Sequence, residues 1–489
     1  MCGDRSAIGV IICCAMPVAI ALPSVAATYT VSDFGDDGSP GQLRTLVAGA
    51  ADTDVINIPA GTIVLQTGRI SILASITIQG AGATNTIIDG DDADRVFRTA
   101  LGTTVTIANV TIRNGFTPFN GGGVESGGTM TLVNCVVTGC EARGVGVYGG
   151  GVFSTGPLTL THCRIEGNEA VDGHGGGVSA EGPLTVEACT IRDNEASIDV
   201  GGVVTSGGGV FASGGGTVTD STITDNESDW GGGIFIHATP LTLTNVTVSG
   251  SRSRDNGGGI ADNNIGSVLE CVTIMGNAAD VDGDGLGTGG GLYVVFAPIN
   301  VRNTVIAGNT DSASHAPDCW GTVESGGHNL IQNTDNCTIN GVTDGNIYGV
   351  EARLGPLQDN GGRTHTHAPL ADSPVIDAGD SAACPMEDQR GVARPVDYDG
   401  DGVADCDIGA VEAIIDCNGN MVHDAGDLAG GTSTDCDGNG VPDECQPDSD
   451  GDGTIDACEG PCGCGATTAV LASLWVLAAV RLTRRRKGR

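Results

Sequence analysis

Seven glycine triplets recur along the middle of the chain at nearly regular intervals. They begin at Gly121, Gly149, Gly175, Gly207, Gly231, Gly257 and Gly289, so the gaps are 28, 26, 32, 24, 26 and 32 residues. A period of this size indicates stacked structural units. The short apolar alternation after most triplets predicts strands separated by Gly and Asn turns. Because one such unit cannot bury its own apolar face, the units must stack into a parallel β-solenoid.

The pattern Ile-x-x-Asn that closes most units predicts two ladders. Equivalent residues of stacked coils lie about 4.8 Å apart on neighbouring strands. A side-chain amide at a turn can bond both its neighbour in the stack and the backbone of the next coil. The expected inward aliphatic ladder is Ile165, Ile191, Ile223, Val248, Ile274 and Ile306. The expected amide ladder is Asn168, Asn194, Asn226, Asn277 and Asn309, interrupted by Cys140 and Ser251.

Small and medium residues stand two positions before the aliphatic ladder, and Cys135, Cys163 and Cys189 are three of them. We expect these cysteines to pack in the core, because a free cysteine behaves as a small hydrophobe. The alternative, a metal or redox stack, lacks partnering histidines.

The repeat carries a resemblance to bacterial surface proteins. Its glycine and Ile-x-x-Asn positions are similar to the Gly-Gly-[Ala/Gly]-[Ile/Val] and Phe-x-x-Asn repeats of polymorphic outer-membrane proteins, with Ile in place of Phe. "GQLRTLVAGAADTDVINIPAGTIVLQ" and the stretch from "ASITIQGAGATNTIIDG" onward resemble the N-terminal coils of right-handed β-helix surface proteins, although Thr45-Leu46 replace the usual Glu-Ala. The resemblance implies an all-β fold, a right-handed parallel β-helix.

Four motifs follow the coils: "SGGHNLI", "LGPLQDNGGRTHTHAPLADSPVIDAGD", "DQRGVARP" and "CDIGAVE". They resemble the choice-of-anchor Q region, which closes such helices and precedes a variable anchor. Together the resemblances cover about residues 28–413. Within these motifs His365 and His367 stand two residues apart without a third metal ligand nearby, so we expect a structural role for them.

The charge balance is strongly acidic, with a formal net charge of −38 from 60 acidic and 22 basic residues. The single lysine, Lys487, lies beyond the apolar C-terminal segment. Binding of nucleic acid or of anionic lipid is therefore not expected of the main body. So much acid repels itself unless it is solvated or bridged by cations, which favours calcium as a bound ion.

The N-terminal residues 1–27 are typical of a secretory signal peptide. They contain Arg5, an apolar run from Ala7 to Leu22, and Val25-Ala26-Ala27 as a cleavage site. A lipoprotein signal at Cys13 or Cys14 is the alternative, with Ile12 where a small residue would be expected. The remainder of the chain is thus expected to be exported.

The C-terminal residues 461–489 contain an apolar run from Gly463 to Val480 and then a basic cluster. Such a run is marginal for a membrane span but is helped by flanking arginines. The Cys/Gly motif, apolar run and basic cluster together resemble tripartite C-terminal sorting signals of bacterial envelopes. A membrane anchor and a cleaved sorting signal therefore both remain open.

Three candidate calcium loops lie in residues 414–460. A calcium cage needs oxygen ligands on alternate residues and a glycine at position 6. "DSDGDGTIDACE" offers Asp448, Asp450, Asp452, the Thr454 carbonyl, Asp456 and Glu459. "DCDGNGVPDECQ" offers Asp435, Asp437, Asn439, the Val441 carbonyl and Asp443, with Gln446 at position 12. "DCNGNMVHDAGD" offers Asp416, Asn418, Asn420, Asp424 and Asp427 but lacks the glycine. The alternative is a solvated Asp/Gly linker.

Tandem loops with "DEC" and "DAC" resemble thrombospondin type 3 repeats, which are calcium-loaded stalks. Export permits disulfides, and 15 of the 18 cysteines lie beyond the signal peptide, so at least one is unpaired or joins another chain. Bridges of Cys417 with Cys436 and of Cys445 with Cys458 are one possible connectivity. "DYDGDGVAD" from Asp397 and "DVDGDG" from Asp280 repeat the start of the calcium pattern. The first is a further calcium candidate, and the second fits a surface turn equally well.

Catalysis must be tested at the residue level, because β-helices also carry polysaccharide lyases and hydrolases. A calcium-assisted lyase needs clustered carboxylates and an Arg or Lys base aimed at the same sugar. We expect Arg164 and Arg192 to face different directions, and more generally the arginines Arg113, Arg143, Arg164, Arg192 and Arg302 not to share one register. The acids before the turn, Glu166, Asp193 and Asp225, are expected to form a solvated turn face.

The sequence thus predicts a signal peptide (1–27), β-helix coils (28–320), a closing region (321–413), calcium loops (414–460) and an anchor or sorting signal (461–489). The function that fits best is a surface adhesin or scaffold, anchored in the membrane through its C-terminus, with a calcium-stabilised stalk and an extracellular polysaccharide or cell-surface ligand. The alternative is a calcium-dependent carbohydrate-active enzyme of the pectate-lyase-like class. A cleft of aromatic and Arg side chains on one sheet would favour the enzyme, and a uniform Thr/Gly face would favour the scaffold.

Overall fold

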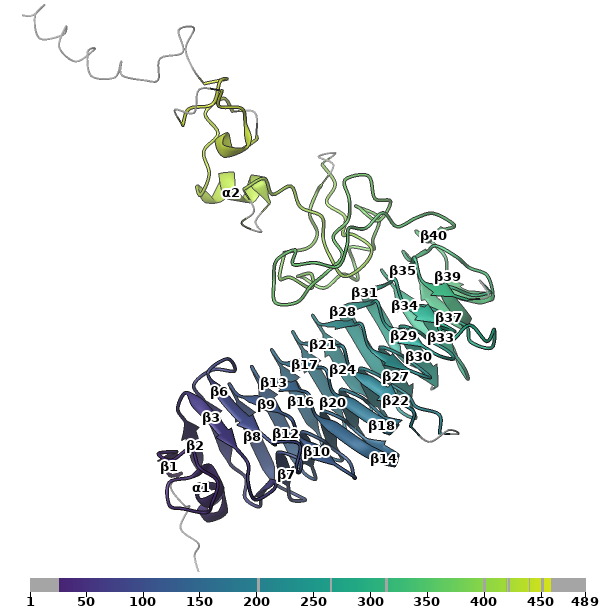
Figure 1. Cartoon of the computed structure of the whole chain (residues 1–489). Helices are drawn as coiled ribbons and strands as arrows, with labels where there is room; N and C mark the ends of the chain where they lie inside the picture. The colour runs from purple at the N-terminus through teal and green to yellow at the C-terminus, as the bar shows by residue number, and fades with distance from the viewer. Residues whose placement is uncertain are drawn as a thin grey trace, which may run out of the picture.

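The fold is a long parallel β-solenoid followed by a loop-rich closing region and a chain of small loops (Figure 1). The computed structural model describes residues 26–199, 203–263, 266–312, 315–398, 402–418, 420, 423–438, 440–449 and 453–458. Most coils contribute a strand to sheet II, one or two strands to sheet I and then a strand to sheet III, while the first and last coils lack the sheet III strand, and all strand pairs between coils are parallel. The expected parallel β-solenoid is confirmed.

Sheet I is the broadest of the three sheets. Its strands are β1 (Thr28–Thr30), β2 (Val55–Ile58), β3 (Gly61–Val64), β5 (Thr77–Gly80), β6 (Thr86–Asp89), β8 (Thr104–Ala108), β9 (Thr111–Arg113), β12 (Thr129–Val133), β13 (Val136–Thr138), β16 (Leu158–Thr161), β17 (Arg164–Glu166), β20 (Leu184–Glu187), β21 (Thr190–Arg192), β24 (Gly216–Thr219), β25 (Thr222–Thr224), β28 (Leu241–Ser249), β31 (Val268–Met275), β34 (Ile299–Arg302), β35 (Val305–Ala307), β38 (Leu330–Ile331), β39 (Cys337–Val342) and β40 (Ile347–Tyr348).

Sheets II and III complete the coils. Sheet II contains β4 (Ile70–Ile72), β7 (Phe97–Thr99), β11 (Val124–Ser126), β15 (Val152–Ser154), β19 (Val178–Ala180), β23 (Val210–Ala212), β27 (Ile234–His237), β30 (Ile260–Asn263), β33 (Leu292–Val294) and the start of β37 (Cys319–Gly326), which continues into sheet I. Sheet III contains β10 (Phe116–Thr117), β14 (Glu141–Tyr148), β18 (Glu169–His174), β22 (Glu195–Ser197), β26 (Glu227–Ser228), β29 (Arg252–Ser253), β32 (Ala278–Ala279) and β36 (Thr310–Asp311).

The helices are short. Helix α1 (Leu43–Gly49) buries Leu43 and Val47 beside the first coils. Helix α2 (Asp424–Gly430) and the 3₁₀ turn η1 (Asp443–Cys445) lie among the candidate calcium loops. Among the described residues no helix is long and apolar enough to cross a membrane. The expected signal peptide and C-terminal anchor lie outside the described residues, apart from Ala26 and Ala27.

The glycine triplets allow neighbouring coils to approach closely. Gly149 has a φ of 71°, which L side chains rarely adopt. A Cβ on Gly150 would lie 2.3 Å from the carbonyl oxygen of Glu169, on the next coil. The triplets are therefore turns in which backbone packs on backbone, as the sequence predicts.

Both predicted ladders are present inside the solenoid. The aliphatic residues of the first ladder pair in register from coil to coil and are fully buried. In the amide ladder, the Asn226 side-chain oxygen accepts from the Asn194 backbone N–H and side-chain amide at 3.0 Å, and its amide donates to the Ile191 carbonyl at 3.0 Å. Ser251 fills a gap in the ladder, donating its N–H to Asn277.

The cysteines beside the aliphatic ladder are free and buried, as expected for core residues. Cys135, Cys163 and Cys189 stack along the coils, and the Cys163 N–H contacts the Cys189 sulfur at 3.2 Å. Burial is one of the causes that raise the pKa of the Cys163 thiol. The Cys163 thiol is therefore protonated at neutral pH.

Replacing a rung of the amide ladder should destabilise the solenoid. Asn226→Ala removes three buried hydrogen bonds and leaves the Asn194 backbone N–H without its acceptor, while the Asn194 amide keeps only its bond to the Ile165 carbonyl. We expect a loss of about 3 kcal/mol in unfolding free energy, measured by urea titration. The matched variant Asn340→Ala, at an exposed position of the last coil, should change it by less than about 0.5 kcal/mol. Equal effects of the two variants would contradict a structural amide ladder.

Sheet III carries a row of glutamates in register. Glu141, Glu169, Glu195 and Glu227 occupy the same position on successive coils. Burial, together with the charges of Glu227 and Glu169, raises the pKa of Glu195, although Arg254 opposes the shift. Like charges stacked at the spacing of one coil destabilise the folded state at neutral pH.

Neutralising this row should stabilise the protein. The folded-state pKa of Glu195 lies above its ordinary value, so the folded state holds the proton more tightly. The free energy of unfolding therefore falls as the pH rises from the ordinary pKa of Glu195 to its raised folded-state pKa. We expect Glu195→Gln to raise the melting temperature at pH 8 and to change it little at pH 4, as measured by calorimetry. Glu141→Gln, which removes the partner of Arg143, is the control and should not raise it.

The closing region packs against the outer face of sheet I over the C-terminal coils (Figure 1). Gln389 bonds Thr247 and Thr222, while His367 lies between the Gly355 carbonyl at 2.7 Å and the Ser249 hydroxyl at 2.9 Å. His367 is buried, and this burial lowers its pKa. The predicted structural role is thus confirmed for His367, whereas the His365 side chain is exposed.

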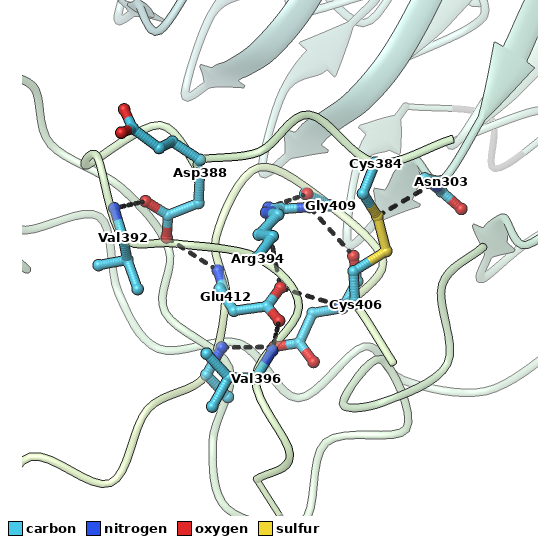
Figure 2. A network of polar contacts seen from close by, with 12 residues as sticks. Asn303, Cys384, Asp388, Val392, Arg394, Val396, Cys406, Gly409 and Glu412 are labelled. Atoms are coloured by element: carbon cyan, nitrogen blue, oxygen red, sulfur yellow. Dashed lines mark hydrogen bonds and ion pairs between the residues drawn. A yellow bond between two sulfur atoms is a disulfide. The ribbon is translucent and has the colours of Figure 1, made fainter. Parts of the chain in front are cut away.

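The motifs "DQRGVARP" and "CDIGAVE" form the buried centre of the closing region (Figure 2). Arg394 donates to the Gly409 carbonyl at 2.8 Å and pairs with Glu412 at 3.5 Å. Asp388 accepts from the backbone N–H groups of Glu412 and Val392. The disulfide Cys384–Cys406 lies beside this network, in contact with Asn303 of the solenoid. These motif residues therefore stabilise the fold of the closing region.

Candidate functional site

One outward row of sheet II changes character along the solenoid. Its residues pair in register from coil to coil. In order they are Ser71, Arg98, Glu125, Phe153, Ser179, Phe211, Phe235, Ala261, Tyr293 and Trp320. The early coils thus carry charge on this face and the later coils carry aromatic rings.

The aromatic rings stack on one another along the axis. The Phe211 and Phe235 ring centroids lie 5.6 Å apart with an interplanar angle of 11°, and those of Tyr293 and Trp320 lie 4.7 Å apart at 21°. Phe211 and Phe235 are only 6% exposed. Because their faces are turned toward each other, these rings form a structural stack and not a platform for sugar rings.

A cavity of about 680 Å³ lies at the charged end of this face. Arg98 and Glu125 come from β7 and β11, while Arg69 and Arg95 come from the residues that precede β4 and β7. Its wall is formed by two surface segments, residues 118–120 and 144–147. The site therefore stands on strands of sheet II and is bordered by the residues that follow β10 and by the second half of β14.

The arginines exceed the acids available to them in this cavity. Glu125 pairs with both Arg95 and Arg98, the latter at 3.2 Å, while Arg69 pairs with Asp94 at 3.1 Å. Burial lowers the pKa of Arg95 to about 10, and the charges of Arg69 and Arg98 act in the same direction. The Nε atoms of Arg69 and Arg95 are buried without a hydrogen-bond partner among the described residues. The cavity thus offers spare positive charge and spare donors to an anion.

A second hollow of about 430 Å³ adjoins the cavity on the other side of the Arg98 and Glu125 row. Leu73 and Leu101 line it with side chains that are 77% and 85% exposed. The face therefore combines a cationic half and an apolar half, separated by one ion pair. This combination suits a ligand that carries both anionic groups and apolar patches.

Arg164 and Arg192 do not face different directions, so the expectation stated above is wrong. Both point outward from sheet I, because Arg164 precedes and Arg192 follows the inward isoleucine of its strand. Both pair with Glu166 at 2.8 Å. Counting along the strand with a period of two would have placed them on one face.

The acids of the neighbouring turn are exposed, as expected for Asp193 and Asp225. Burial, with the charges of Asp225 and Glu166, raises the pKa of Asp193, and Arg192 opposes this. Asp225 accepts from the Thr224 hydroxyl at 2.9 Å. Glu166 is half-buried under its two arginines. Of the remaining arginines, Arg143 lies on sheet III and Arg302 pairs with Asp380 of the closing region.

The three candidate calcium loops share one backbone arrangement. The aspartate at position 9 accepts the N–H of position 2 in each loop: Asp424 from Cys417 at 3.0 Å, Asp443 from Cys436 at 2.9 Å and Asp456 from Ser449 at 2.8 Å. At position 1, Asp435 and Asp448 each accept the glycine N–H of position 6 at 2.9 Å. The first loop shares the bond between positions 2 and 9 with the other two loops, while its position 6 lies outside the described residues.

Side chains at ligand positions converge in the first loop. Asp427, at position 12, lies 2.9 Å from the Asn420 amide and 3.2 Å from the Asn418 amide. The nitrogen and oxygen of an asparagine amide exchange places by a simple flip, so the same positions can present oxygens to an ion. Several other predicted ligands, Asp450, Asp452, Glu459 and Asn439, lie outside the described residues. The described side chains at ligand positions carry the oxygen atoms that calcium prefers in proteins.

The disulfides of the loop segment differ from the suggested connectivity. The observed bridges are Cys417–Cys445 and Cys436–Cys458, so the pairings of Cys417 with Cys436 and of Cys445 with Cys458 are both wrong. Each observed bridge joins position 2 of one loop to position 11 of the next. The reason is spatial, because the chain of each loop returns past the start of the preceding one. A further bridge, Cys319–Cys337, lies in the last coils.

The two partial patterns also form turns. Asp397 accepts the Gly402 N–H at 3.0 Å. The carboxylates of Asp280, Asp282 and Asp284 lie within 4.8 Å of one another, and Asp280 accepts the Gly285 N–H at 3.1 Å. This geometry is that of an acidic turn.

Comparisons with known proteins support the architecture. The family model described as "Right handed beta helix region" matches residues 76–268. Together with the parallel coils, this confirms the right-handed parallel β-helix. A search of curated proteins finds no significant match.

Several solved structures match with low similarity. The pectate lyase Pel9A matches at 13% identity and a TM-score of 0.41, covering 80% of this chain and 97% of that chain. The A-module of the Azotobacter vinelandii mannuronan C-5 epimerase AlgE6 matches at 14% identity and a TM-score of 0.34, covering 68% and 100%. A PL6 alginate lyase in complex with a trisaccharide matches at 13% identity and a TM-score of 0.31, covering 74% and 93%. Similarity at this level gives no information on the ligand of this chain.

Proposed function

We propose that the protein is an exported, envelope-anchored β-helix that binds an acidic polysaccharide or another anionic cell-surface ligand without turnover. It would act as an adhesin or scaffold on a calcium-stiffened stalk. The observation that carries the proposal is the cavity of sheet II, where Arg69, Arg95 and Arg98 are gathered in a chain of net charge −38. Positive charge gathered at one place on an otherwise acidic surface attracts an anionic ligand to that place.

The shape of the site favours an extended ligand. The cationic cavity and the apolar hollow lie side by side across the Arg98 and Glu125 row, and both are open to solvent. A glycan has carboxylate groups for the arginines and apolar ring faces for Leu73 and Leu101. A single small anion would use only one half of the site.

The residues of the cavity favour binding over catalysis. Glu125 is the only acid among the residues that line the cavity, and two arginines already neutralise it. A hydrolase needs two carboxyl groups on opposite sides of the bond, and a calcium-assisted lyase needs several carboxylates around the ion. Neither set is present in this lining.

The second candidate function is a carbohydrate-active enzyme, and one observation favours it. The pKa of Arg95 is lowered to about 10 by burial and by its arginine neighbours. An arginine that releases its proton more readily than usual could act as the base of a lyase. The ion pair with Glu125 opposes this role, because it stabilises the protonated guanidinium.

Titration with polysaccharide tests the proposal. Polygalacturonate should bind the purified protein, as measured by calorimetry at about 0.1 M salt, without forming unsaturated products that absorb ultraviolet light. The double variant Arg69→Gln with Arg98→Gln removes two exposed charges and should weaken binding about tenfold or more. The control Arg143→Gln, on sheet III, should bind normally. Calcium-dependent product formation would establish the enzyme instead, and normal binding by the double variant would place the ligand elsewhere.

Calcium is proposed for the three loops of the stalk. The support is the bond between positions 2 and 9 in all three loops, the bond between positions 1 and 6 in the second and third loops, and the convergence of Asn418, Asn420 and Asp427 in the first. A bound calcium would neutralise the carboxylates and fix each loop. The disulfides between consecutive loops would then make the stalk a rigid spacer.

Calcium titration tests this second part. We expect the protein to bind calcium in preference to magnesium, with a rise in the melting temperature of the loop segment. Asp427→Ala should remove one binding equivalent, because it deletes the position-12 carboxylate of the first loop. Asp344→Ala, an exposed aspartate of the last coils, should leave the stoichiometry unchanged. Unchanged stoichiometry in Asp427→Ala would exclude the first loop as a calcium site.

A further inference from the structure

A cleft of about 720 Å³ lies between sheet I and the closing region, away from the cavity of sheet II. Its floor is formed by the outer face of β17, β21 and β25, and residues 357–365 of the closing region overhang it. The closing region covers the coils that follow, where it buries Thr222 and Thr247. The cleft thus stands where the covered part of sheet I meets its open part.

Hydrogen bonds between the two sides set the width of this cleft. The Thr222 hydroxyl donates to the His365 carbonyl. The Gln389 amide donates to the hydroxyls of Thr222 and Thr364 at 2.9 Å each. These groups are buried at the inner end of the cleft, so the overhang is fixed before any ligand arrives.

The floor carries two arginines that share Glu166. Arg164 and Arg192, on adjacent coils, both bind Glu166 at 2.8 Å, and Arg192 also lies 3.7 Å from Asp193. Two guanidinium groups have ten N–H donors, whereas one carboxylate has about four acceptor sites. The two side chains are 51% and 46% exposed. Most of their donors therefore remain available in the cleft.

The overhang adds a third arginine. Arg363 lines the cleft, is exposed and forms no hydrogen bond or ion pair with any described residue. His162 and His365 line it as well, and Asp225 at the rim is bonded by the Thr224 hydroxyl. Positive groups from the solenoid and from the closing region thus face the same recess.

We infer that this cleft is a second anion-binding site, which takes the tetrahedral oxyanion of a sulfate or phosphate ester on a surface polymer. Arginines on both sides of the recess can donate to more than two oxygen atoms at once. A sulfate or phosphate group offers three such oxygens, whereas a carboxylate offers two. The site is separate from the polysaccharide cavity of sheet II and does not depend on it.

The open part of sheet I gives the polymer a path along the axis. Arg113, Thr138, Glu166 and Arg192 occupy one outward row in register on successive coils. Arg113 is 39% exposed and pairs with Asp89 at 2.7 Å. A polymer bound in the cleft can therefore continue over this row of side chains toward the N-terminal coils.

Calorimetry with dextran sulfate and with polyphosphate tests the proposal on the full chain. The salt concentration should be about 0.1 M, so that the net negative charge of the protein is screened while contacts inside the cleft persist. The double variant Arg192→Gln with Arg363→Gln should weaken binding of these probes about tenfold or more. Arg353→Gln is the matched control, since it lies on the closing region outside the cleft and pairs with the exposed Asp372.

The outcomes separate this site from the polysaccharide site. Binding of dextran sulfate alone, or of polyphosphate alone, would support the cleft and identify the ester it prefers, provided that the cleft variant loses this binding. The variant Arg69→Gln with Arg98→Gln should keep it. If the sheet II variant lost dextran sulfate binding and the cleft variant kept it, the proposal that the cleft binds anions would be overturned. The proposed function would remain intact. Absence of binding to both probes would also overturn it.

Discussion

The structure depends on the parallel hydrogen bonding of one coil to the next. Each coil has too few apolar residues to form a core alone, so a repeated register is what allows burial. The Asn ladder and the glycine triplets fix this register from the two ends of each coil: Asn226 bonds the backbone of the previous coil, and Gly150 lets backbones meet without a Cβ. A one-residue slip would expose the isoleucines beside these turns. The fold therefore constrains the residue type at positions that contact the neighbouring coil, whereas outward positions can take different residue types from coil to coil.

This division explains how much could be predicted from the sequence. The solenoid, its aliphatic ladder and its Asn ladder follow from the period, because inward residues repeat from coil to coil. The cavity of sheet II could not be found in this way, since Arg69 and Arg98 lie in coils before the first glycine triplet. A signal existed nevertheless, because aligning "FRT", "VES" and "VFS" would have placed Arg98 beside Glu125 and Phe153. Arg164 and Arg192 were misplaced because their positions were counted from different ladder residues.

The loop segment shows a different limit of prediction. The ligand pattern can be read from the sequence because calcium fixes the spacing of oxygen donors within a single loop. The disulfides link different loops, and four cysteines allow three connectivities that spacing alone does not distinguish. The observed bridges, Cys417–Cys445 and Cys436–Cys458, use the same two loop positions each time. The repeat thus extends to the cross-links, since each loop is joined to the next through the same two loop positions.

The two cationic recesses have a common origin in the solenoid. Outward rows of adjacent coils lie about 4.8 Å apart, so arginines from different coils come together without a dedicated core to position them. At long range the net charge of −38 repels a polyanion. At about 0.1 M salt this repulsion is screened beyond about 10 Å, whereas guanidinium contacts within a recess are not. The proposed recognition of an anionic polymer would therefore be confined to the two recesses, and the acidic remainder of the surface would suppress binding elsewhere.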